Sequence, residues 1–231
     1  MAGRSLDGAV VAVVGAGGGL GAPTVAALAA RGAAVLACGP RAERLDGTGV
    51  AAPVVLDLRD PSAGGALVAA VRSGPGRLDG LVNAAGVVAF GDLVDTPDEV
   101  VEELFLTNVL GPLWLLRRVV PLLEESKGFV AQVSAVVAEQ PMASMAAYSA
   151  SKAALTAADA ALYRELRRRG ISVCDVRPPH TETGLAGRPL AGSAPRLPVG
   201  LDPGAVAARI VAAVESGESE VPSTAFAATG S

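Results

Sequence analysis

A tyrosine and a lysine four residues apart form the pattern in this sequence that is best suited to acid–base chemistry. Tyr148 and Lys152 stand near the start of a predicted helix over residues 145–169, and residues four apart share one face of a helix. A tyrosine ordinarily ionises only in alkaline solution, but a neighbouring ammonium group lowers the pKa of its phenol. Such a pair could pass a proton to or from a carbonyl oxygen. A partly buried tyrosine beside a solvated lysine is the alternative interpretation.

A glycine-rich turn near the start of the chain could hold an anion. Residues 10–14 form a short apolar run rich in β-branched side chains, which predicts a strand buried on both faces. Glycines follow at once, and residues 22–30 have the composition of a helix. A helix start offers unpaired N–H groups and the positive end of its dipole, while glycine lets a pyrophosphate approach the backbone closely. A tight strand-to-helix turn without a ligand is the alternative.

Short apolar runs alternate with helical patterns along the rest of the chain. The further predicted strands are residues 33–38, 53–56, 80–82, 129–134 and 171–176, with a short one at Val221. The further predicted helices are residues 61–71, 98–125 with a bend near Gly111, 145–169 and 203–216. Thr96 is expected to cap the second of these helices, and Asp202 the last. We therefore expect an α/β fold, a doubly wound Rossmann-like domain over residues 1–231 with about seven parallel strands and helices on both faces.

Composition and charge exclude several classes of function. The net charge is −4 and no basic stripe is present, so nucleic acid is not an expected partner. The two cysteines lie at the ends of predicted strands, which favours free buried thiols, and no metal-ligand cluster exists. No stretch is long and apolar enough for a membrane span. We therefore expect a cytoplasmic protein that does not contact a membrane.

The glycine spacing and the Tyr–Lys pattern together resemble the short-chain dehydrogenase/reductase family, in its classical-type subgroup, over nearly the whole chain. Its first turn is usually written TGxxxGxG; here the glycines are Gly15, Gly19 and Gly21, and Val14 replaces the threonine. Residues 83–86 read N-A-A-G, as the family does after its fourth strand. Asn108 resembles the helix asparagine that holds a water molecule in the family's proton relay.

This resemblance implies NAD(P)-dependent oxidoreduction of a small carbonyl or alcohol substrate. Tyr148 would be the acid/base, while Lys152 would lower its pKa and hold the nicotinamide ribose. Asp57 would hydrogen-bond the adenine. The cofactor-binding residues implied by the resemblance are Gly15, Gly17, Gly19, Leu20, Gly21, Arg41, Asp57, Asn83, Ala84, Gly86, Tyr148, Lys152, Pro178, Thr181 and Thr183. The resemblance also implies a homodimer or homotetramer, in which helices 98–125 and 145–169 pair across the interface.

The family's substrate-orienting serine is missing from its usual place. The family has this serine thirteen residues before the tyrosine, and that position holds Ala135. Ser134 is the fourth candidate catalytic residue, because a one-residue shift in the loop 136–146 would bring its hydroxyl to the site. Neighbours on an extended segment point to opposite sides, so Ser134 need not substitute. A nucleotide-binding sensor or scaffold with weak or no catalysis is therefore the competing hypothesis.

Two further segments bear on the ligands. The family usually reads P-G-x-V/I-x-T where this chain has Pro178, Pro179, His180, Thr181, Glu182 and Thr183, so His180 is either a substrate contact or a surface residue. The short loop 183–200 is mostly Gly, Pro, Ala and Leu, which indicates an apolar and rather open substrate pocket.

No acid follows the second strand to bind a ribose 2′-hydroxyl, whereas Arg41 could pair with a 2′-phosphate. NADP(H) is therefore favoured over NAD(H), with a surface turn at Arg41 as the alternative.

Overall fold

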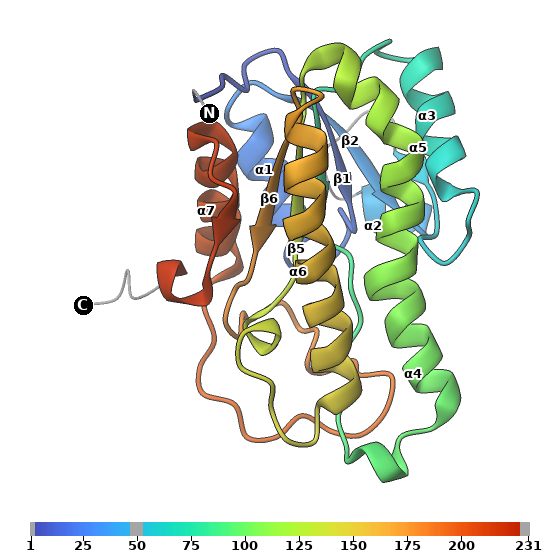
Figure 1. Ribbon diagram of the computed structural model, residues 1–231, viewed down its shortest axis with the longest axis vertical. Helices are drawn as coiled ribbons and strands as arrows, with labels where there is room; N and C mark the ends of the chain where they lie inside the picture. Colours follow the sequence, from blue (N-terminus) through green and yellow to red (C-terminus); the bar gives the residue numbers. More distant parts are fainter. Residues whose placement is uncertain (1–2, 47–52, 227–231) are drawn as a thin grey trace.

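Seven parallel strands form one sheet with helices on both faces (Figure 1). The computed structural model describes residues 3–46 and 53–226. The strand order is β3-β2-β1-β4-β5-β6-β7. The strands are β1 Val10–Val14, β2 Ala34–Gly39, β3 Val54–Val55, β4 Gly80–Asn83, β5 Phe129–Val133, β6 Ser172–Val176 and β7 Glu220–Val221. The winding direction reverses between β1 and β4, and a ligand cleft in such a sheet lies at that switch point. The predicted doubly wound α/β fold is confirmed.

Two apolar clusters hold the helices onto the sheet. On one face, α1 (Gly21–Ala29) and α7 (Pro203–Ser216) pack against inward-facing side chains of β1, β5 and β6. On the other face, α3 (Ala63–Ser73), α5 (Gly111–Ser126) and α6 (Ala146–Arg167) cover the opposite side chains of the same strands. Figure 1 shows α7 beside β6 on one side of the sheet and α6 on the other. The strands are buried on both faces because their residues are apolar without alternation.

The predicted helix over residues 98–125 is divided into three helical segments. α4 (Asp98–Phe105) leads into a π-helical turn at Leu106–Leu110, and α5 continues directly from it. An ideal Cβ on Gly111 would lie 2.4 Å from the Leu58 carbonyl oxygen, so the backbone there passes close to the loop after β3. The predicted Thr96 cap is wrong. Its hydroxyl donates to Asp92 O at 2.9 Å, because Pro97 occupies the position before α4.

The last part of the chain forms as predicted. Asp202 caps α7, its Oδ1 accepting from the Ala205 amide at 2.9 Å. α7 ends at Gly217, whose φ of 74° is a left-handed conformation that glycine adopts without strain. The chain then returns to the sheet, where Val221 of β7 pairs with Val176. Residues 42–45 form one short helix, α2 (Ala42–Leu45).

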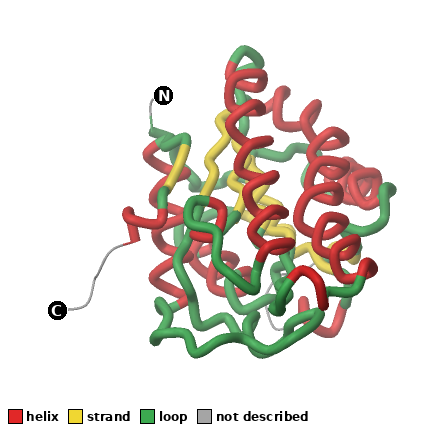
Figure 2. Tube along the Cα trace, turned by 60° about the horizontal axis from the view of Figure 1, so that its bottom comes forward, coloured by secondary structure: helices red, strands yellow, loops and turns green. Residues whose placement is uncertain are grey.

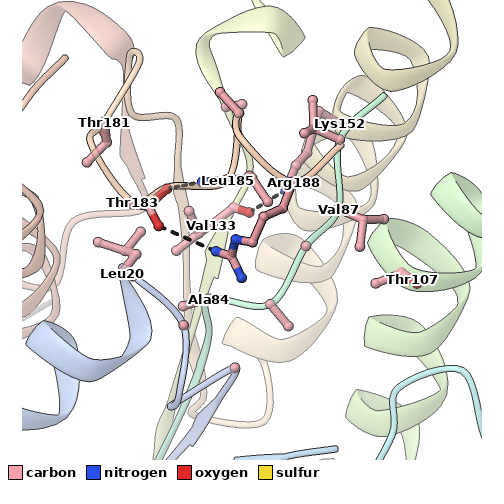
Figure 3. A pocket seen from close by; sticks show the side chains of 18 of the residues that line it. Leu20, Ala84, Val87, Thr107, Val133, Lys152, Thr181, Thr183, Leu185 and Arg188 are labelled. Carbon is pink, nitrogen blue, oxygen red and sulfur yellow. Dashed lines mark hydrogen bonds between the residues drawn. The ribbon is translucent and has the colours of Figure 1, made fainter. Parts of the chain in front are cut away.

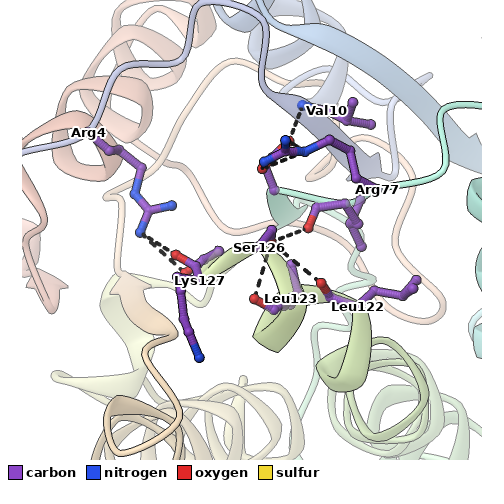
Figure 4. Close-up of polar contacts among 10 residues, drawn as sticks. Arg4, Val10, Arg77, Leu122, Leu123, Ser126 and Lys127 are labelled. Atoms are coloured by element: carbon purple, nitrogen blue, oxygen red, sulfur yellow. Dashed lines mark hydrogen bonds and ion pairs between the residues drawn. The ribbon is translucent and has the colours of Figure 1, made fainter.

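Polar contacts join the chain segments at the amino ends of the strands (Figure 4). Asp79 Oδ2 accepts from the Val10 amide at 2.9 Å and from Arg77 Nε at 3.0 Å. Ser126 Oγ donates to Leu78 O at 2.6 Å. Arg4 donates to Gly128 O at 3.2 Å, and its guanidinium lies 5.1 Å from the Phe129 ring centre. The opposite ends of the strands lead instead into the long loops that Figure 2 brings forward.

Candidate active site

A cavity of about 500 Å³ opens at the carboxyl ends of the strands. It brings together residues that are far apart in the sequence, from the glycine turn after β1 to the loop after β6. The predicted site residues that line it are Gly15, Gly17, Gly19, Leu20, Arg41, Asp57, Ala84, Gly86, Ser134, Tyr148, Lys152, Pro178, Thr181 and Thr183. Gly21, Asn83 and Asn108 do not line it; they support the residues that do.

The glycine turn presents its backbone to this cavity. Gly15 has φ of 80°, and an ideal Cβ there would lie 2.8 Å from the Ala85 amide nitrogen. A Cβ on Gly19 would lie 2.2 Å from Thr183 O, so this glycine allows the loop after β6 to pack on the turn. Among the described residues, the amides of Gly17, Gly19 and Leu20 donate no hydrogen bond, and no side chain caps α1. Free amides at a helix start make a cradle for an anion.

Tyr148 and Lys152 lie in the first turns of α6, and both are buried. Lys152 Nζ donates to Val133 O at 3.0 Å, which fixes the ammonium group against β5. Burial raises the pKa of Tyr148 to about 12 and lowers the pKa of Lys152 to about 8. The direction for Tyr148 is opposite to the predicted one, because removing a phenolate from water outweighs any help from the lysine.

The two asparagines of the predicted site hydrogen-bond to the backbone that forms one wall of the cavity. Asn108 lies in the π-helical turn, where its Oδ1 accepts from the Val87 amide at 2.9 Å and its Nδ2 donates to Val87 O at 3.0 Å. Asn83 Oδ1 accepts from the Ala85 amide at 3.2 Å. Both side chains therefore hold the backbone between β4 and α4, and this backbone faces the cavity through Ala84 and Gly86.

Ser134 and Ala135 face different surroundings. Ser134 Oγ donates to Lys152 O at 3.0 Å and accepts from Thr156 Oγ1 at 2.9 Å, so its hydroxyl is engaged by α6. Ala135 packs in the apolar cluster that contains Tyr148. Its backbone is extended, as expected for neighbours that point to opposite sides. This geometry favours Ala135 over Ser134 for the position in which the family has its serine.

Several charged groups line the cavity near the carboxyl ends of β2 and β3. Asp57 pairs with Arg59, whose Nε lies 3.0 Å from Asp57 Oδ1, and this hydrogen bond lowers the pKa of the carboxyl group. Arg59 also lies 3.4 Å from Glu103. Arg41 and Arg44 line the same end, and no ion pair of the described residues involves either of them. The sequence did not predict Arg44 and Arg59, since only the folded loops bring them to this cavity.

A further arginine enters from the loop after β6 (Figure 3). Arg188 Nε donates to Gly184 O at 3.1 Å, and its Nη2 lies 3.5 Å from Thr183 O, the atom that also packs on Gly19. Figure 3 shows the side chain pointing into the cavity between Thr183 and Ala84. This residue could not be predicted from the sequence, because nothing local distinguishes it from a surface arginine. His180 also lines this cavity, and its Nε2 lies 3.4 Å from Glu182.

A parallel sheet with a glycine turn at its switch point and a Tyr–Lys pair on the same cavity defines the short-chain dehydrogenase/reductase class. The family model described as short chain dehydrogenase matches residues 9–191. The chain belongs to this family of oxidoreductases, and the resemblance in its motifs is confirmed.

Individual relatives support the same assignment. A short chain dehydrogenase of Pseudocercospora fijiensis is 32% identical over 191 residues, which are 78% of this chain and 62% of that protein. An uncharacterized oxidoreductase of Methylorubrum extorquens is 35% identical over 84% of this chain and 85% of its own length. The crystal structure of a short chain dehydrogenase from Burkholderia cenocepacia, in complex with NADP, has a TM-score of 0.84 at 27% identity, covering 95% of this chain and 90% of that one. This chain thus spans less than two thirds of the Pseudocercospora protein but most of the other two.

No helix within residues 3–46 and 53–226 is both long and apolar enough to cross a membrane.

Proposed function

We propose that this chain is an NADP(H)-dependent oxidoreductase that interconverts a carbonyl compound and an alcohol, with Tyr148 as the acid/base. The observation that carries the proposal is that Tyr148 and Lys152 line the same cavity as the free amides of the glycine turn. A proton donor beside a dinucleotide cradle is the arrangement that hydride transfer to a carbonyl needs.

The residues present fit a dinucleotide. The glycine turn offers unpaired amides and the start of α1 for a pyrophosphate. The cavity is lined by five cationic side chains, Arg41, Arg44, Arg59, Lys152 and Arg188, against two acids, Asp57 and Glu103, although the whole chain carries a net charge of −4. This local excess of positive charge favours a ligand with several phosphates.

The preference for NADP(H) rests on the residues after β2. β2 ends at Gly39 and is followed by Pro40 and Arg41, so no carboxylate stands where one would bind a ribose 2′-hydroxyl. Arg41 and Arg44 lie three residues apart around the start of α2, and their guanidinium groups could both reach a 2′-phosphate.

In the proposed reaction the cofactor supplies or accepts the hydride, and the chain supplies binding and the proton. The Tyr148 hydroxyl donates its proton to the carbonyl oxygen in reduction and accepts one from the alcohol in oxidation. Lys152 would hold the nicotinamide ribose, and its positive charge would stabilise the phenolate. Asn108 keeps Val87 and the adjoining wall in place through its two backbone contacts. The raised pKa keeps the Tyr148 phenol protonated near neutral pH, so the hydroxyl carries the proton that reduction of a carbonyl needs.

The substrate end of the cavity is apolar. The side chains that line it there are Val88, Phe90, Val137, Met142, Met145 and Leu185. Because these groups offer no hydrogen bonds, we propose a hydrophobic ketone or aldehyde whose carbonyl group is oriented by Tyr148 alone.

The test is NADPH oxidation with a panel of hydrophobic ketones and aldehydes, compared between the natural chain and two variants. Tyr148→Phe should abolish most turnover and leave NADPH binding intact, because only the hydroxyl proton is removed. Tyr163→Phe removes the hydroxyl of the other tyrosine in the sequence and should leave turnover unchanged. Equal turnover by the Tyr148→Phe variant and the natural chain would refute the acid/base role.

A second function, NADP(H) binding with little or no catalysis, is favoured by one observation. Ala135 brings no hydroxyl to the cavity beside Tyr148, and the Ser134 hydroxyl is engaged by Lys152 O and Thr156. If neither the natural chain nor an Ala135→Ser variant turns over any substrate while both bind NADPH, this second function replaces the first.

A further inference from the structure

Polar side chains at partnered positions of three adjacent strands form a row across the otherwise apolar sheet. Asn83 of β4 is the register partner of Gln132 of β5, and Gln132 is the register partner of Asp175 of β6. Side chains at partnered positions of a parallel sheet point to the same face, here the face that α6 covers. Asn83 Nδ2 donates to Gln132 Oε1 at 2.9 Å, and Gln132 Nε2 donates to Asp159 of α6 at 3.2 Å. All four side chains are buried.

The two carboxyl groups of this row are incompletely bonded. Asp159 Oδ2 and Asp175 Oδ1 are both shielded from water and have no hydrogen-bond partner among the described residues. A buried acceptor without a partner costs free energy, and a buried unpaired carboxylate costs more. A proton on one carboxyl group would remove one charge and create an O–H donor.

Other charges surround the two acids. Lys152 lies two helical turns before Asp159 on α6, and its Nζ donates at 3.0 Å to the carbonyl oxygen of Val133, the residue after Gln132 in β5. Arg177 Nε lies 3.2 Å from Asp175 Oδ2 and also 3.2 Å from Glu139, while Glu220 of β7 binds the same guanidinium. The Arg177 charge is therefore divided among three acids, and it cannot neutralise Asp175 fully. The Thr156 hydroxyl and the Cys174 thiol are further polar neighbours of the two acids.

We propose that Asp159 and Asp175 share one proton as a buried acid pair, and that the single negative charge left on the pair keeps Lys152 protonated. The sharing of the proton is independent of the proposed function; the importance of the Lys152 charge rests on it. Asp159 and Asp175 are thus positioning residues for Lys152, and they do not contact the cavity.

The pKa shifts agree with this geometry. Burial and the nearby Asp175 charge raise the pKa of Asp159 well above its usual range, and burial raises the pKa of Asp175 to about 6. Burial lowers the pKa of Lys152 to about 8, whereas Asp175 and Asp159 both act to raise it. Without the charge of the pair, Lys152 would lose its proton at a lower pH.

The shared proton is tested by NMR titration of the full chain labelled with ¹³C at the aspartate carboxyl carbons. We expect two carboxyl groups to titrate in linked steps, with one still protonated near neutral pH, and either Asp159→Asn or Asp175→Asn to leave a single simple step. Asp95→Asn, which removes an exposed carboxyl group, should leave these steps unchanged. Two independent titrations below pH 5 in the natural chain would overturn the proposal, with no variant needed.

The effect on Lys152 is tested by ¹³Cε-lysine NMR, because the sequence has only two lysines, Lys127 and Lys152. In the Asp159→Asn/Asp175→Asn double variant, the titration of Lys152 should fall by about one pH unit, a tenfold change in its protonation equilibrium. Asp159→Asn alone should change it little, because Asp175 still supplies the charge.

Lys127, far from the pair on the exposed end of α5, is the internal control. An unchanged Lys152 titration in the double variant would overturn the link to Lys152. Absence of turnover in the natural chain, with both NMR titrations as expected, would count against the proposed function and not against the shared proton.

Discussion

The environments of residues 134 and 135 decide which hydroxyl, if any, meets the substrate. The Ser134 hydroxyl makes two hydrogen bonds to α6, and one of them holds the carbonyl of Lys152. Ala135 lines the cavity with a methyl group only. A carbonyl substrate would then be polarised by Tyr148 without a second donor, which limits the stabilisation of the charge that develops on its oxygen.

Restoring the missing donor should raise turnover. Ala135→Ser adds a hydroxyl to the cavity next to Tyr148, and we expect kcat for carbonyl reduction to rise by roughly 10²-fold, the scale of one hydrogen bond to developing charge. Ser134→Ala should change kcat by much less, because its hydroxyl faces α6. Both are measured as NADPH consumption under saturating substrate. A large loss in Ser134→Ala with no gain in Ala135→Ser would show that Ser134 is the catalytic serine after all.

The arginines after β2 should discriminate between the two cofactors. Arg41→Ala and Arg44→Ala should each weaken NADPH binding by about tenfold or more, the effect of a lost hydrogen bond between charged groups, and leave NADH binding almost unchanged. Dissociation constants from cofactor fluorescence measure this, with Arg117→Ala on exposed α5 as the control. If both cofactors lose affinity equally, the 2′-phosphate is bound elsewhere.

Asp159 should make the stability of the protein depend on pH. Its pKa is raised in the folded protein by burial, so its contribution to stability is complete in acid and is lost as the pH rises through that folded value. The raised pKa of Asp175, about 6, acts in the same direction. Asp159→Asn removes the group that must ionise and should therefore stabilise the fold at pH 8 but not at pH 4.

Urea unfolding at pH 4 and pH 8 measures this difference, with Asp95→Asn as the exposed control. A variant that is equally destabilised at both pH values would mean that Asp159 serves only as an acceptor for Gln132.

At the scale of elements, the π-helical turn between α4 and α5 positions Asn108 against Val87, and its end is set by a close backbone contact at Gly111. Gly111→Ala would push α5 away from Leu58 O, only 2.4 Å from the new Cβ. We expect a loss of about 1–3 kcal/mol in the free energy of unfolding and weaker cofactor binding, as Asn108 shifts.

Gly65 in α3 is the matched control for Gly111. An ideal Cβ there meets nothing within 4 Å, so Gly65→Ala should stabilise the protein by about 0.5–1 kcal/mol through helix propensity alone. Chemical denaturation compares the two variants. Equal effects of the two substitutions would remove the special role of the Gly111 contact.

The elements themselves were largely predictable, because buried parallel strands are continuous apolar runs and helix ends carry local signals such as Asp202. The Thr96 cap failed because a proline at position 97 changes which residue begins the helix. Arg188, Arg59 and Asp159 could not be predicted, since each acquires its partners only when distant segments meet. The pKa of Tyr148 was predicted in the wrong direction because burial, which a sequence pattern does not report, outweighs its neighbours.

At the scale of the whole molecule, one helical face is more apolar than a monomer requires. Leu106, Leu110 and Trp114 are spaced by four residues along the π-helical turn and α5, and none of them is fully buried. Leu110 is 42% exposed. Spacing by four places such residues on one face of a helix, and a continuous apolar stripe of this kind favours a second copy of the chain.

We therefore propose a homodimer or homotetramer that buries this stripe. Leu110→Glu should lower the oligomeric state measured by light scattering at micromolar concentration, because it would place a charge in an apolar interface. Val94→Glu changes a residue that is 91% exposed in the short 3-10 helix before α4 and should leave the mass unchanged. A natural chain that is monomeric at this concentration would contradict the proposal.

The two cysteines can report how the two halves of the core open. Cys38 of β2 belongs to the cluster under α3 and α5, and Cys174 of β6 to the cluster under α1 and α7. Both thiols are free and buried, and burial raises the pKa of each to about 12. A thiol reagent can therefore modify either one only when its own cluster opens to water. Labelling rates of single-cysteine variants would then give a separate opening free energy for each face of the sheet. A ligand bound in the cleft at the carboxyl ends of β1 and β4 should slow the labelling of both cysteines.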